Sequence, residues 1–415
     1  MAMRNKKVLP FILMLTLSLF PESLAADIDM VILVSDNEAD STLAESVANI
    51  IGAKGIVKVP WGIYNPDYSA EVLKYVPDRV IIIGGPTAVP IDYEKDFEEM
   101  GIPYERLWGK NRYETNLAVI QKLKNEFPEE FSQIETVYIT HGRDVLSMLM
   151  QKELKQMPSK SIWIFTDKSY EELTLQALDE VIKTARNRPW VEIVITSRFV
   201  QLAPIDTITN FLKQRGYTEG AHFTISNVRP AKRFILEALK LVDNKTHIAE
   251  KFLDGLDIPR AKRRLSIAKE QIARAWKLYS LGDYQEAYIL AVAASRNADF
   301  VISISAREWN GIIQGRPEIR LKREVLRLEA KVKVLKELGM DVSTIEAEIN
   351  ELKAILNKPV ISPDEYRDIL LNKIPQIKKE LREAFIEEKR SRRRIPVEHV
   401  PGRGEKDRAP RKSGR

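Results

Sequence analysis

A glycine pair and two arginines in the first third of this 415-residue chain are the residues best suited to binding chemistry. Gly84 and Gly85 follow an apolar run, where the carboxyl end of a parallel strand usually meets a ligand. Asn111 precedes Arg112 as a predicted helix cap, and Arg106 lies close by in the chain. Amides at a helix N-terminus and arginine forks together can hold an anion. Arg112 could instead pair with an internal carboxylate, and both interpretations are open at this stage.

Residue patterns for catalysis are sparse. The sequence has no metalloprotease frame, no nucleophile elbow and no phosphate-binding loop that ends in Lys-Ser/Thr. His141 beside Asp144 could act as a base, but an isolated loop histidine is more often structural. The absence of cysteine excludes disulfide scaffolds, thiolate metal sites and cysteine nucleophiles. We therefore expect no enzyme activity, no metal site and no cofactor.

The N-terminus has the pattern of a secretory signal peptide. Arg4, Lys6 and Lys7 precede an apolar run at 8–20, and small residues lead up to Ala25. The run is shorter than the roughly 20 residues that span a bilayer. We expect cleavage after Ala25, a secreted protein at the extracellular cell surface, no transmembrane segment in the mature chain and no nucleic-acid partner.

The opposite end of the chain is strongly basic. The whole sequence has a formal net charge of +6, yet residues 389–415 hold eleven Lys/Arg against three Asp/Glu. The rest of the chain is therefore slightly acidic. The basic segment is rich in Arg, Gly and Pro and has no apolar periodicity, so we expect it to be disordered. It either binds an acidic polymer or only keeps the chain soluble.

Short apolar runs alternate with amphipathic helical segments between residues 27 and 242. This pattern predicts an α/β fold with a mostly parallel sheet that is covered on both faces. The predicted strands are 30–34, 55–59, 80–83, 136–140, 161–166 and 192–196.

The α/β region contains an internal repeat. The run at 31–35 matches that at 137–141, and residues 106–112 line up with 223–229. The spacing between matched segments grows slightly, as a few inserted loop residues would cause. We infer two copies of one α/β unit, of which the second is eroded.

The pattern becomes helical after a polar segment at 243–246, which contains an Asn-x-Thr sequon and is predicted to be an exposed linker. A stripe of alanines predicts close helix packing, and a later run has coiled-coil spacing. The stripe is Ala287, Ala291, Ala294 and Ala298, and the coiled-coil positions are Leu321, Val325, Leu328, Val332 and Leu335.

Capping signals divide the rest of this region into separate helices. Ser343 with Glu346 and Ser362 with Glu365 have capping-box spacing. The first box predicts an antiparallel partner for the coiled-coil helix. Pro375 should kink or restart the last helix.

The segment 82–89, Ile-Ile-Gly-Gly-Pro-Thr-Ala-Val, is followed by Arg-x-x-Gly-x-x-Arg-Tyr-x-Thr. This combination resembles the cell wall binding repeat 2 family over residues 28–122. The matched positions are Gly84, Gly85, Arg106, Gly109, Arg112, Tyr113 and Thr115.

Members of that family are exported surface proteins with Rossmann-like α/β repeats, usually three in tandem, that attach noncovalently to anionic cell-wall polymers. The resemblance implies that the seven matched residues bind ligand and that the partner is an anionic envelope polymer or surface-layer component. The second unit departs from the pattern. Ser197-Arg198 replaces Gly-Gly, only Arg229 remains of Arg-Tyr-x-Thr, and no third repeat is visible.

The predicted organisation has five parts. They are a signal peptide (1–25), a first α/β repeat (26–125), a degenerate second repeat (133–243), a helical domain (247–388) and a basic tail (389–415).

These parts predict a noncatalytic surface protein that attaches to an anionic envelope polymer or surface-layer glycan, with Arg106 and Arg112 as anion donors. In a second interpretation the helical domain is a scaffold that binds a protein partner or self-associates. In a third, the α/β crevice belongs to an uncharacterised secreted hydrolase.

Overall fold

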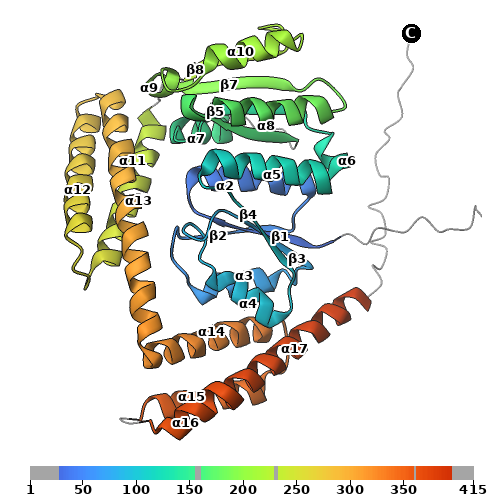
Figure 1. Ribbon diagram of the computed structural model, residues 1–415, viewed down its shortest axis with the longest axis vertical. Helices are drawn as coiled ribbons and strands as arrows, with labels where there is room; N and C mark the ends of the chain where they lie inside the picture. The colour runs from blue at the N-terminus through green and yellow to red at the C-terminus, as the bar shows by residue number, and fades with distance from the viewer. Residues whose placement is uncertain (1–27, 155–159, 229–231, 359–360, 395–415) are drawn as a thin grey trace, which may run out of the picture.

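Two four-stranded, all-parallel sheets form the α/β part of the chain (Figure 1). The computed structural model describes residues 28–154, 160–228, 232–358 and 361–394, so the predicted signal peptide lies outside the described residues. The first sheet has the order β2-β1-β3-β4 and the second β6-β5-β7-β8. The identical strand order agrees with the internal repeat, and the predicted α/β class is confirmed. The strands are β1 (Met30–Ser35), β2 (Gly55–Val59), β3 (Arg79–Ile83), β4 (Tyr104–Leu107), β5 (Thr136–His141), β6 (Ser161–Thr166), β7 (Trp190–Thr196) and β8 (Phe223–Val228).

The sequence patterns missed one edge strand in each sheet, β4 and β8. The other strands are mostly continuous apolar runs, whereas β4 is largely half-exposed and β8 alternates between buried or half-buried and exposed positions. An edge strand is covered less completely and so lacks a continuous apolar run. The matched segments of the repeat, 106–112 and 223–229, reach both missed strands, but the first includes only the last two residues of β4 while the second covers all of β8.

The two α/β units share one core. Helices α2 and α5 of the first unit lie between the two sheets (Figure 1), and the side chains of both helices pack in one cluster with residues of β5, β6 and β7. The helices of the first unit are α2 (Glu38–Ile51), α3 (Pro66–Lys74), α4 (Asp92–Met100), α5 (Arg112–Glu126) and α6 (Pro128–Phe131). Those of the second are α7 (Val145–Leu154), η1 (Lys168–Tyr170), α8 (Glu171–Thr184), α9 (Ser197–Val200) and α10 (Ile205–Gln214).

Helix α11 (Lys232–Leu253) runs through the segment that was predicted to be a linker. Thr246, within the sequon, is 2% exposed, and its hydroxyl donates to the carbonyl of Val242 at 2.8 Å. The predicted exposed linker at 243–246 is therefore wrong. Its polar residues belong to an amphipathic helix whose buried face holds the polar Thr246 by an internal hydrogen bond.

Helices α11, α12 (Pro259–Ser280) and α13 (Tyr284–Gly315) pack side by side (Figure 1). The predicted alanine stripe of α13 is confirmed as core, because all four alanines are at most 1% exposed. Within α13, Tyr284–Trp309 is long and apolar enough to cross a membrane by length and composition, although no such span was expected. Here the alanine stripe brings α13 close to its neighbouring helices.

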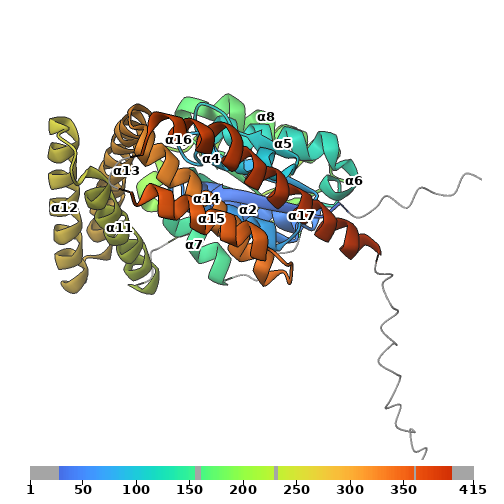
Figure 2. The same cartoon turned by 90° about the horizontal axis from the view of Figure 1, so that it is seen from below.

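The remaining helices cover the first sheet from the side of α3 and α4 (Figures 1 and 2). They are α14 (Pro317–Glu337), α15 (Ser343–Leu356), α16 (Pro363–Asp368), the π-helical turn η2 (Ile369–Lys373) and α17 (Ile374–Arg394). The coiled-coil positions of α14 are buried in one cluster with α3, α15 and α17. The seam is thus part of the first unit's core and not of a separate two-stranded coiled coil.

The predicted helical domain, 247–388, therefore does not stand apart. Its first half packs in one cluster with the second α/β unit and its second half packs in another with the first sheet. Helical periodicity identifies the apolar face of a helix but not the partner that covers it.

The local helix signals had mixed outcomes. The capping box of Ser362 and Glu365 is confirmed, and the π-helical turn ends at Lys373, two residues before Pro375, where a kink or restart was expected. The box at Ser343 is wrong, because Asp341 accepts from the Ser343 amide at 3.1 Å and Glu346 pairs with a lysine.

The start of the predicted disordered tail is also wrong. Helix α17 continues to Arg394, and Lys389 forms an ion pair with Asp78 of the first unit at 2.8 Å. Arg393 pairs with the same carboxylate. The remainder of the predicted tail, 395–415, lies outside the described residues.

Candidate functional site

Arg106 on β4 is held by contacts within the first unit. Its side chain is 8% exposed, and its Nε pairs with Glu94 at 2.5 Å. Its Nη1 donates to the carbonyls of Gly84 and Val89 at 2.8 and 3.0 Å. An internal carboxylate thus takes up the charge of Arg106, and its predicted ligand role stays a prediction that these contacts do not favour. Arg106 holds the turn after β3 in place.

Three further motif residues shape the loop between β4 and α5. A Cβ on Gly109 would lie 2.2 Å from the Glu114 Cβ, so only glycine fits. The Gly109 amide donates to the Thr115 hydroxyl at 3.0 Å, and Thr115 is buried. Tyr113 is buried against Tyr170 with ring centroids 4.7 Å apart, and its hydroxyl donates to Asp167 at 3.3 Å. Tyr113 and Thr115 thus have structural contacts in this loop, and their predicted ligand roles stay predictions.

Arg112 is the predicted residue that reaches a binding cavity with its charge available. It begins α5, whose cap Asn111 accepts from the amides of Tyr113 and Glu114 at 3.0 Å each. Its Nη1 donates to the carbonyl of Gly142 in the second unit. Because that bond uses only one of the guanidinium's N–H donors, the others are available to a ligand.

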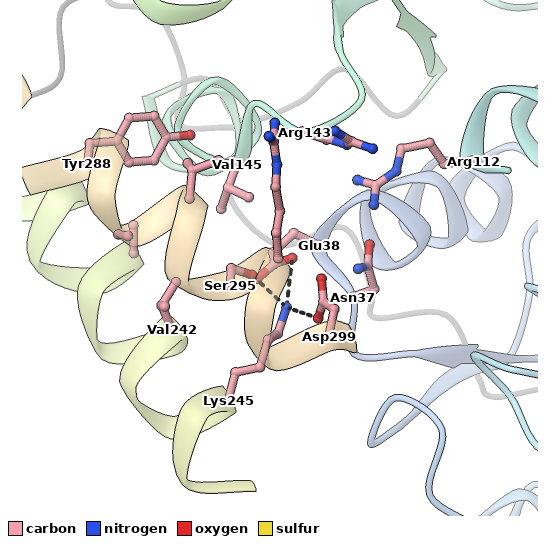
Figure 3. Close-up of a pocket in the computed structure, with 14 residues that line it drawn as sticks. Asn37, Glu38, Arg112, Arg143, Val145, Val242, Lys245, Tyr288, Ser295 and Asp299 are labelled. Atoms are coloured by element: carbon pink, nitrogen blue, oxygen red, sulfur yellow. Dashed lines mark hydrogen bonds and ion pairs between the residues drawn. The ribbon is translucent and has the colours of Figure 1, made fainter. Parts of the chain in front are cut away.

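A cavity of about 310 Å³ lies where the loops after β1 and β5 meet α11 and α13. Four arginines come from four segments around it and form what we call the arginine cluster: Arg112, Arg143, Arg198 and Arg296. Three of them line the cavity, and Arg198 lies near Arg296. Figure 3 shows the guanidinium groups of Arg112 and Arg143 facing each other at one end of this arginine pocket.

No arginine of the cluster forms an ion pair with a carboxylate in the described part of the chain, although the charge of Arg112 acts on nearby Asp40. In the described part of the chain, the side chains of Arg143, Arg198 and Arg296 have neither an ion pair nor a hydrogen bond. Desolvation and then the nearby charges of Arg143, Arg198 and Arg112 lower the pKa of Arg296. Like charges held together without ion-pair partners of their own favour an anion between them.

The other end of the pocket is a closed ionic network. Lys245 of α11 lies 3.2 Å from Asp299 of α13 and 3.9 Å from Glu38 of α2, and it donates to Ser295 at 3.3 Å (Figure 3). Burial by itself would lower the pKa of Lys245, but Asp299 and Glu38 more than offset that effect and raise it. This network joins the first unit to the helices and fixes the floor of the pocket.

The two residues considered for catalysis are buried. Asp144 is fully buried and accepts from the amide and hydroxyl of Thr196 at 2.7 and 3.0 Å. His141 is 1% exposed, and its Nε2 lies 3.0 Å from Asp167. Burial, opposed by Asp167 and aided by Arg143, lowers the pKa of His141 to about 4. Both side chains are committed to internal contacts.

The sequence patterns missed Arg143, Arg198 and Arg296 as anion donors. Arg143 follows β5 at the place where Asn37 follows β1, so the repeat itself contained a signal for it. Arg198 stands in place of a motif glycine, and Arg296 lies on the exposed side of the alanine helix. Arg229, the predicted counterpart of Arg112, lies outside the described residues.

Comparisons with known proteins add little about function. No protein-family model matches the chain, so its resemblance to the cell wall binding repeat 2 family stays a prediction. An uncharacterised protein of Methanocaldococcus jannaschii is 44% identical over 118 residues, which cover 28% of this chain and 34% of that protein. The match thus spans about a third of that relative's length.

Among solved structures, Cwp6 from Clostridium difficile matches 49% of this chain and 29% of its own, with 17% identity and a TM-score of 0.35. A likeness this distant carries no argument about function, which must come from the chain's own residues.

Proposed function

We propose that this chain is an exported, noncatalytic surface protein that attaches to an anionic envelope polymer or surface-layer glycan through the arginine pocket. The observation that supports this proposal is the arginine cluster, whose charges come from both α/β units and from α13 without carboxylate partners among the described residues. Arginine forks bind phosphate and carboxylate groups by paired hydrogen bonds.

A binding role fits the surroundings of the pocket better than a catalytic one. The carboxylates that line the pocket, Glu38 and Asp299, are paired with Lys245. His141, which was considered as a base, does not line the pocket and is buried against Phe199 with ring centroids 4.4 Å apart. A group that acts as an acid or base must come within hydrogen-bond reach of the substrate. His141, whose pKa is lowered to about 4, does not titrate near neutral pH, and a binding site does not require a group that does.

The test is sedimentation of the mature protein with isolated envelope from its source organism. Hydrogen bonds to charged groups contribute about 1.5–3 kcal/mol each. Arg143→Gln and Arg296→Gln should each therefore weaken binding by roughly 10- to 100-fold. Raising NaCl from about 0.05 to about 0.5 M should weaken it as well, because salt screens exposed charges.

The matched control is Arg263→Gln, an exposed arginine on α12 outside the pocket, which should leave binding unchanged. Circular dichroism confirms that each variant is folded. Undiminished binding of the Arg143→Gln/Arg296→Gln double variant would rule out the arginine pocket as the attachment site.

A further inference from the structure

A second cleft, of about 240 Å³, adjoins the arginine pocket at the carboxyl edge of the first sheet. It contains two tryptophans, the glycine turn after β3 and the loop before α5. Asn37 and Arg112 line both the cleft and the arginine pocket, so one ligand can contact the two together. We call this second site the tryptophan cleft.

Trp108 is the main exposed aromatic surface of the cleft. It is 50% exposed, and a Cβ on Gly85 would lie 3.0 Å from its Cε3 atom. One part of the ring therefore lies against the Gly85 backbone while the rest faces solvent. Gly84 has a φ of +120°, which disfavours any other residue and keeps the turn close to the ring. Trp61, half-buried, lines the same cleft.

Polar groups suited to hydroxyls surround the rings. The Asn37 Oδ1 accepts from the Ala39 amide at 3.2 Å, which leaves the side-chain NH₂ as a donor. One oxygen of Asp40 accepts from Ser35 at 3.0 Å, which leaves the other as an acceptor. Lys110 is exposed, and its ammonium has no carboxylate partner within the described ranges.

The chemistry of this lining selects a class of ligand. A pyranose ring presents a face of weakly positive C–H groups, which complements the negative face of an indole, and an edge of hydroxyls that need both donors and acceptors. A purely aliphatic ligand would leave the amide, the carboxylate and the ammonium without hydrogen bonds. A bare anion would make no use of the exposed indole.

We propose that the tryptophan cleft binds a sugar ring stacked on Trp108, while an anionic substituent of the same ring enters the arginine pocket beyond Arg112. The ligand class is thus a glycan unit that carries a phosphate or similar group. The inference rests on the proposed function in one respect, since the arginine pocket holds the charged substituent.

Isothermal titration calorimetry of the full chain tests this, with glucose 1-phosphate, galactose 1-phosphate and N-acetylglucosamine 1-phosphate as sugar probes and inorganic phosphate as the probe without a ring. At least one sugar phosphate should bind tenfold or more tightly than inorganic phosphate. Trp108→Ala should remove that advantage and leave phosphate affinity unchanged. Trp108→Phe, which keeps a smaller ring, should retain part of it.

Leu281→Ala is the control, because Leu281 is 71% exposed but lies at the turn between α12 and α13, outside the cleft. The sugar subsite is overturned if Trp108→Ala weakens the binding of phosphate and of sugar phosphate equally. It is also overturned if Trp108→Ala weakens the binding of neither probe. If phosphate binds but no sugar adds affinity, the sugar subsite fails and the proposed function survives. If Trp108→Ala weakens the binding of sugar phosphate but Arg143→Gln does not, the sugar subsite stands and the proposed function fails.

Discussion

Asp144 is a buried carboxylate that joins three parts of the chain. It follows β5 and caps the start of α7 by accepting from the Ser147 amide at 3.3 Å and from the Ser147 hydroxyl at 2.8 Å. It also accepts from the Thr196 amide at the end of β7 and from Tyr288 of α13 at 3.4 Å. Burial raises its pKa, and the hydrogen bonds from Thr196 and Ser147 oppose that effect. Its contacts make it an organiser of the pocket wall.

We predict that Asp144→Ala lowers the free energy of unfolding by about 2–4 kcal/mol, because several buried donors lose their acceptor. Urea denaturation measures this loss. Asp206→Ala, which removes an exposed carboxylate, should change stability by no more than about 0.5 kcal/mol. A hydrolase would instead lose turnover in Asp144→Asn without a comparable loss of stability.

His141 should make stability depend on pH. Burial lowers its folded-state pKa to about 4, below the unfolded value of about 6.5. The contribution of His141 to the free energy of unfolding is therefore complete above pH 6.5. It is lost as pH falls toward 4, because the unfolded chain binds the proton first. The shift corresponds to about 3 kcal/mol. Urea denaturation at pH 7 and pH 4 measures the difference in the free energy of unfolding between the two conditions, and His141→Gln should reduce that difference. An unchanged difference would contradict the role of His141 in the pH dependence.

At the scale of elements, an ionic network fastens α14 and α17 to α4. Asp96 is 1% exposed and accepts from the Nε of Arg327 at 2.8 Å, while Lys331 lies 3.1 Å away. Glu99 also accepts from Lys378 of α17 at 2.7 Å. Burial would raise the pKa of Asp96, but Lys331 and Arg327 hold it below its ordinary value.

Arg327→Met should cost about 3–5 kcal/mol of stability, because it removes a partner of a buried carboxylate. The exposed pair of Lys336 and Glu346 provides the control, and Lys336→Met should cost less than about 1 kcal/mol. Thermal and urea denaturation of both variants checks the difference. Equal losses would mean that the network is as weak as a surface ion pair.

At the scale of the whole molecule, the helices that follow the α/β units complete the cores of those units. Residues of α12 and α13 pack in one cluster with the second sheet, and residues of α14, α15 and α17 pack in another with the first. The arginine pocket depends on this arrangement, since α11 and α13 supply one of its walls.

We therefore predict that an isolated fragment 245–388 does not fold into a compact monomer. Separation from the α/β units would expose the buried coiled-coil positions of α14, such as Leu321 and Leu328, and large exposed apolar patches favour aggregation. Size-exclusion chromatography and circular dichroism of the fragment check this. A monodisperse, cooperatively unfolding fragment would support an independent helical module instead.

Local patterns by themselves determined the α/β class, six of the eight strands, the repeat and the alanine stripe. Each of these follows from periodicity or an apolar run within one segment, as in β1, where every residue is buried. The same patterns located Arg112 at a helix start, because Asn111 carries its capping chemistry in its residue type.

Only the tertiary structure decided which charges are free. Arg106 and Arg112 have the same residue type and belong to one motif, yet Glu94 neutralises the first while the second points into a shared pocket. Arg296 lies 184 residues from Arg112 in the chain and meets it because α13 packs across both units. A local pattern holds no information about such a contact, since burial and counterions are set by segments far apart in sequence.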